Sequence, residues 1–84
     1  MNVDQPLVHL SDLSLAAALV SVGHEMINAS MSEADGMYFA FARTKKLRKS
    51  ADKYWAGTLK VKARQYSDNK DNLRKRARAS KFEL

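Results

Sequence analysis

The 84-residue chain contains no cysteine, one proline and three glycines. The absence of cysteine excludes disulfides, thiolate metal sites and a cysteine nucleophile, and it is ordinary for a cytoplasmic protein, which we expect this chain to be. There is no glycine-rich phosphate loop followed by lysine, and no serine lies in a nucleophile-elbow pattern. The sequence therefore predicts a protein that is not an enzyme and that needs no cofactor.

Long apolar runs and clustered metal ligands are also lacking. The longest apolar run, residues 13–22, is too short to span a bilayer, and no positive residue precedes it as in a signal peptide. His9, His24 and Glu25 are the available ligand or acid–base groups, and they do not form a spaced set of three or four. We expect neither a membrane contact nor a metal site.

The most informative absence is that of positive charge before residue 43. All 15 lysines and arginines follow that point, against four acidic residues, so residues 43–84 carry a net charge of +11. Residues 1–42 contain five acidic residues and no basic one, a net charge of −5. A chain that concentrates positive charge in one region usually meets a polyanion there, most often nucleic acid.

The first half of the chain predicts a helix followed by a β-hairpin. Residues 1–10 are interpreted as a short arm or edge segment, residues 11–80 as one small domain and residues 81–84 as a tail. Ser11 is the expected N-cap of a helix that ends near Gly23 and is apolar on almost every side, as in a buried helix. Residues 24–31 and 37–42 then alternate as strands around an Asp-Gly turn.

Two further helices are expected in the basic half. One begins after the N-cap Thr44 and ends at Gly57, and the other runs from about Ala63 to near Lys81. Its apolar stripe is thin, so we expect it to dock along only its first half and to project its basic end into solvent. Residues 58–61 are a link or a third strand. The predicted fold is α+β, with a buried N-terminal helix, a β-hairpin and two helices, of which the last is strongly basic.

Several short patterns together resemble a known family. They are Asp12-Leu13-x-Leu15-Ala16-Ala17-x-Leu19, Gly23-His24-Glu25, Phe39-x-Phe41, Tyr54-Trp55-x-Gly57-x-Leu59-x-Val61, and Tyr66 with Lys70. The chain resembles, over residues 12–73, an uncharacterised family of small bacterial and phage domains, a domain of unknown function. The resemblance implies a small α+β fold and a bacterial or viral source but no activity, and no functional residue carries over from it. The basic runs lie outside the shared pattern.

The candidate nucleic-acid contacts form two clusters. The first lies at the start of the helix that follows Thr44, where the helix dipole disfavours cations but free backbone N–H groups can bind a phosphate. The alternative without a ligand is a charged, solvated helix that begins a few residues away from the predicted start. The second lies on the last helix, where Asp68 and Asp71 can pair with only a few of the cations and should leave Arg74, Arg76, Arg78 and Lys81 uncompensated. The candidates are Arg43, Lys45, Lys46, Arg48, Lys49, Lys53, Arg74, Lys75, Arg76, Arg78 and Lys81.

Aromatic residues near the clusters have two interpretations. Tyr54 and Trp55 can stack on an unpaired base, but they share a helix face with Leu47 and Ala51, so we expect them in the core. Phe39 and Phe41, which alternate on one face of their strand, are expected in the core. Tyr38 lies on the opposite face and is the better stacking candidate if that opposite face is open.

The sequence thus predicts a non-catalytic accessory protein that binds RNA or DNA, mainly by its phosphates, within a larger protein or ribonucleoprotein assembly. One alternative is a basic adaptor or inhibitor that occupies an acidic groove on a protein partner. Another is a phage virion or packaging component whose positive tail touches packaged DNA. The oligomeric state is left open.

Overall fold

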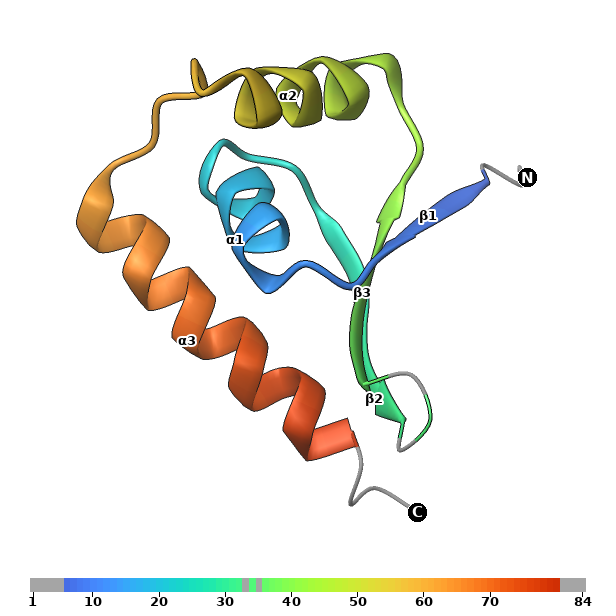
Figure 1. Cartoon of the computed structure of the whole chain (residues 1–84). Coiled ribbons are helices and arrows are strands. Elements are labelled where there is room, and N and C mark those ends of the chain that lie inside the picture. The colour runs from blue at the N-terminus through green and yellow to red at the C-terminus, as the bar shows by residue number, and fades with distance from the viewer. Residues whose placement is uncertain (1–5, 33, 35, 81–84) are drawn as a thin grey trace.

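The computed structural model describes residues 6–32, 34 and 36–80. The elements follow in the order β1 (Leu7–Leu10), α1 (Leu13–Ser21), β2 (Met26–Ser32), β3 (Gly36–Ala42), α2 (Lys45–Ala56) and α3 (Ala63–Ser80). The α+β fold and the order of helix, hairpin and two helices are as predicted. Figure 1 shows the three helices gathered on one side of the sheet.

The sheet has three antiparallel strands in the order β1-β3-β2. Its third strand is β1, from the segment expected to be an arm or edge, while residues 58–61 form a link with no strand. Val8 pairs with Phe41 and Leu10 with Phe39, and the backbone N–H of Arg43 donates to the carbonyl of Pro6 at 3.0 Å. The start of the described chain is therefore held against the strand that leads into α2.

The two faces of the sheet differ sharply. Phe39 and Phe41 are fully buried under the helices, as their alternation predicted. The opposite face carries Leu7, His9 and Tyr38, and the His9 and Tyr38 rings meet edge to face with centroids 5.6 Å apart. No described helix covers that face (Figure 1). The three strands contain no lysine or arginine, so this open face offers no positive charge to a polyanion.

Helix α1 is the central helix of the core. The side chain of Asp12, not the expected Ser11, caps it by accepting from the Leu15 N–H at 3.1 Å. Residues 15–19 are almost completely buried, and Gly23 follows the helix with φ of +101°, a conformation that glycine adopts without strain. The prediction of a helix buried on most faces is confirmed.

Helices α2 and α3 cover α1 from two sides (Figure 1). Thr44 caps α2 by accepting from the Leu47 N–H at 3.0 Å, and Gly57 ends it in the left-handed region with φ of +78°. Both boundaries are as predicted. Helix α3 then packs on α1 and on β2, with the link 57–62 carrying the chain from one helix to the other.

The prediction that α3 docks along only its first half is wrong, because its second half is docked as well. Leu73 and Ala77, in its second half, are 3% and 0% exposed, whereas Ala63 is exposed and Tyr66 only partly buried. The hydroxyl of Ser80 also accepts from the Met31 N–H at 3.0 Å and ties the end of α3 to β2. The small side chain of Ala77 lets α3 approach α1 and β2 closely, while the lysine and arginine side chains project from the other sides of the helix.

Candidate nucleic-acid interface

The first basic cluster lies on α2 and at its entry. Arg43, Lys45, Lys46, Arg48, Lys49 and Lys53 are all exposed. Because Thr44 is the N-cap, two lysines occupy the first two helical positions, and the alternative of a misplaced helix start is excluded. The first turn contains no acidic residue. The backbone N–H groups of Leu47 and Arg48 bond to Thr44, which leaves those of Lys45 and Lys46 pointing out of the helix without a partner among the described residues.

The second cluster lies on the second half of α3. Lys75, Arg76 and Arg78 are exposed, and Lys81 lies outside the described residues. Arg74 was expected to be uncompensated, but its guanidinium lies 3.5 Å from the Asp71 carboxylate, one turn away. Within residues 6–32, 34 and 36–80 this is the one ion pair that involves a lysine or arginine. The other described cations of both clusters therefore keep their charge unneutralised.

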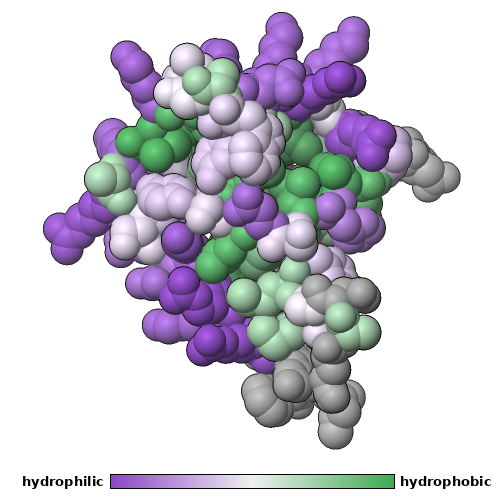
Figure 2. Space-filling model, viewed as in Figure 1, coloured by the Kyte–Doolittle hydropathy of each residue, from purple (hydrophilic) through white to green (hydrophobic). Residues whose placement is uncertain are grey.

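The two clusters lie on different sides of the molecule. Figure 2 shows hydrophilic side chains along the edge formed by α2 and again beside α3, with hydrophobic patches between them. Lys60 and Lys62, in the link between the helices, are also exposed, while Leu59 and Val61 are half-buried. These two lysines were not among the predicted nucleic-acid contacts. Their alternation with Leu59 and Val61 is nevertheless typical of an extended segment with one buried side and one exposed side. They extend positive charge from α2 toward α3.

The prediction that Trp55 belongs to the core is wrong. Its side chain is 66% exposed at the end of α2, whereas Tyr54 is partly buried against the core and meets the Trp55 ring edge to face at 5.0 Å. At about 100° per residue, Thr44, Arg48, Ala51 and Trp55 fall within a sector of about 60° on α2. An exposed aromatic ring thus shares a helix face with the guanidinium of Arg48.

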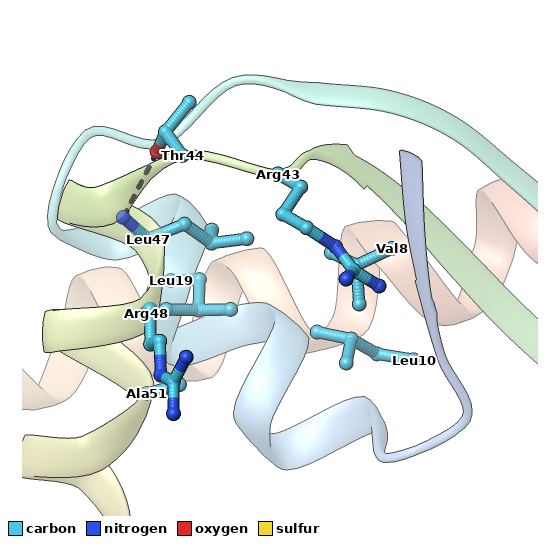
Figure 3. Close-up of a pocket in the computed structure, with 8 residues that line it drawn as sticks. All are labelled: Val8, Leu10, Leu19, Arg43, Thr44, Leu47, Arg48 and Ala51. Atoms are coloured by element: carbon cyan, nitrogen blue, oxygen red, sulfur yellow. Dashed lines mark hydrogen bonds between the residues drawn. The ribbon is translucent and has the colours of Figure 1, made fainter. Parts of the chain in front are cut away.

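The same face of α2 borders a hollow of about 290 Å³ between the helix, α1 and β1. Its lining consists of Val8, Leu10, Leu19, Arg43, Thr44, Leu47, Arg48 and Ala51. Figure 3 shows Arg43 beside the strand residues Val8 and Leu10, and Arg48 beside Ala51, with the two leucines of the helices between them. Five aliphatic side chains are combined with two cations and one hydroxyl, and no carboxylate of the described residues lines the hollow.

His24 connects the loop after α1 to α2. Its Nε2 lies 2.8 Å from the Ser50 hydroxyl oxygen. Burial, and secondarily the charge of Lys46, lowers the pKa of His24 below its usual value, so the ring favours its neutral form. No group of three or more possible metal-ligating side chains converges within the part of the chain that the structure describes.

None of the helices in the described ranges is long and apolar enough to cross a membrane.

No curated protein and no solved structure is significantly similar to the chain. A family model, however, matches residues 6–79, a span that includes β1 and most of both basic clusters. The chain belongs to the family described as Domain of unknown function (DUF5659).

Proposed function

We propose that this chain binds RNA or DNA, mainly through backbone phosphates, and that it acts without catalysis as an accessory protein of a bacterial or phage assembly. The observation that carries the proposal is the exposure of the cations on α2 and α3 with a single carboxylate partner among the described residues. Lysine and arginine that neutralise phosphates release condensed counterions, which supplies most of the affinity of sequence-independent binding.

The start of α2 supports a phosphate contact. The N–H groups of Lys45 and Lys46 and the positive end of the helix dipole lie among four cationic side chains. Cations are unfavourable at this end of an isolated helix by about 0.3 to 1 kcal/mol each, so a bound anion would offset a local cost of the sequence.

Trp55 supports contact with an unpaired base. Proteins that hold single strands combine basic surfaces with exposed aromatic rings on which bases stack. Trp55 meets this description better than Tyr38, because Tyr38 lies on a sheet face without cations.

A basic adaptor that fills an acidic groove on a protein partner is the competing function. One observation favours it, namely the exposure of Leu7 and Ile27, 42% and 49%, in the half of the chain that carries no positive charge. Such side chains can extend a contact with a protein but offer nothing to a phosphate backbone.

The test is the affinity of the full chain for a single-stranded RNA, a structured RNA and a duplex DNA of matched length, titrated across salt. If about five phosphates are contacted, log K should fall with log salt at a slope of about −4.5 on duplex DNA and about −3.5 on a single strand. Binding to one polymer that persists at about 150 mM salt is expected. Weak binding to all three that vanishes at that salt would contradict the proposal and favour the adaptor.

A further inference from the structure

The hollow between β1 and α2 has the chemistry of a ligand site, and its two arginines also belong to the first basic cluster. Its floor and walls are the aliphatic side chains of Val8, Leu10, Leu19, Leu47 and Ala51. Arg43 and Arg48 supply the charge at its sides and come from two different segments, the end of the sheet and the helix (Figure 3). A ligand that satisfies both parts has an apolar body and an anionic end.

The hydrogen-bonding groups of the lining further restrict the chemical class of ligand that the hollow can bind. Guanidinium groups only donate, and the Thr44 oxygen already accepts from the Leu47 N–H, which leaves its hydroxyl hydrogen as a further donor. A ligand with N–H or amino groups, such as a nucleobase, would find few acceptors here. A carboxylate is acceptor-only, and its two oxygens match the planar fork of a guanidinium.

The size of the hollow limits the apolar body. At about 290 Å³ it lies at the lower end of ligand pockets, which run from about 300 to about 1,000 Å³. With about 30 Å³ for each water-sized group, it has room for about eight to ten heavy atoms. The aliphatic lining contains no aromatic ring that would select a flat ligand.

We propose that this hollow binds a short aliphatic carboxylate, with the chain against Leu10, Leu19 and Leu47 and the carboxylate at the cationic rim to which Arg43 and Arg48 contribute. Neither arginine forms an ion pair with any carboxylate in the described ranges, so the ligand would displace water and not an internal partner. The hollow would otherwise hold water against five aliphatic side chains, which is unfavourable.

The test is an NMR titration of the full chain with octanoate, kept below its micelle concentration and without nucleic acid. Saturable shifts at Val8, Leu10 and Ala51 are expected. Octanol and octylamine, which lack the anionic end, and acetate, which lacks the chain, should bind at least tenfold more weakly. Equal responses to octanoate and to acetate, or shifts that follow all basic residues without saturation, would overturn the proposal.

Matched variants separate the pocket from general charge. Arg43→Gln with Arg48→Gln should lower octanoate affinity at least tenfold, while Lys60→Gln with Lys62→Gln, which removes the same charge outside the hollow, should leave it unchanged. Ala51→Leu narrows the hollow without changing charge and should also weaken binding. Equally weakened binding in the two charge variants would contradict the site. Because nucleic acid is absent, failure here does not bear on the proposed function, and failure of polynucleotide binding does not bear on this site.

Discussion

Trp55 is the residue at which local pattern and structure disagree most. On α2 it lies about 80° from Leu47 and about 100° from Tyr54, so it stands at the margin of the apolar stripe and not within it. Whether a marginal side chain is buried depends on which elements pack beside it, and Trp55, at the end of α2, is left 66% exposed. That arrangement is tertiary, and no spacing within residues 44–57 reveals it.

Trp55 is also the one tryptophan of the chain, so its fluorescence reports a single site. A saturating single-stranded oligonucleotide should quench this fluorescence through stacking. Trp55→Ala should weaken single-strand binding by about 1 to 3 kcal/mol, the usual value of one stacked base, while Trp55→Phe should retain part of it. Because the ring is mostly exposed, unfolding midpoints by circular dichroism should change little. Unchanged fluorescence at saturation would exclude stacking on Trp55.

His24 predicts a pH dependence of stability. Its pKa is lowered in the folded chain by burial and by Lys46, so the unfolded chain binds more protons as the pH falls through the ordinary histidine pKa of 6.5. The stabilisation is therefore present above about pH 6.5 and is lost toward lower pH. Urea midpoints should fall between about pH 7 and pH 5, and His24→Gln should flatten this slope. An equal slope in the variant would contradict the assignment.

At the scale of the elements, the two ends of α2 are well predicted, the N-cap of α1 is missed by one residue, and docking is not predicted. Thr44 and Gly57 bound α2 as expected because their effects are local: a hydroxyl accepting an N–H three residues on, and a left-handed backbone. The docking of α3 depends instead on which half of a thin stripe meets β2. Leu73 and Ala77 give the closer approach, and the chain direction after the link 57–62 brings them there.

Leu73 should therefore matter more to stability than its place among charged residues suggests. Leu73→Ala removes a side chain that is 3% exposed and should lower the free energy of unfolding by about 2 to 5 kcal/mol. Lys75→Ala, two residues on and exposed, should change it by less than about 0.5 kcal/mol. Chemical denaturation followed by circular dichroism measures both. A small effect of Leu73→Ala would mean that α3 does not dock by this half.

At the scale of the whole molecule, the fold separates charge as the sequence does. The strands and α1 contain no lysine or arginine, and the described cations lie at the entry to α2, on α2, in the link and on α3. The segregation could be read directly from residue order, but the place of each cluster could not. The pairing of β1 with β3 joins segments about 30 residues apart, and a strand of four residues gives too weak a signal to predict it. Likewise, the open sheet face and the hollow exist only once these pairings are made.

The most direct measurement compares two variants that lower the net charge by the same amount. Arg76→Gln with Arg78→Gln removes two unpaired cations from α3; Arg74 is left intact because its pair with Asp71 would also be broken. Leu7→Asp with Asn28→Asp adds two negative charges on the open sheet face, where both positions are exposed.

Affinity for a single-stranded RNA and its dependence on salt are then measured for both variants and the parent chain, with circular dichroism confirming the fold. The account predicts that the α3 variant binds more weakly with a slope reduced by about 1.4, or about 0.7 for each phosphate that is no longer neutralised, while the sheet variant keeps the parent slope. Equal affinities and slopes in all three would contradict binding through the basic helices.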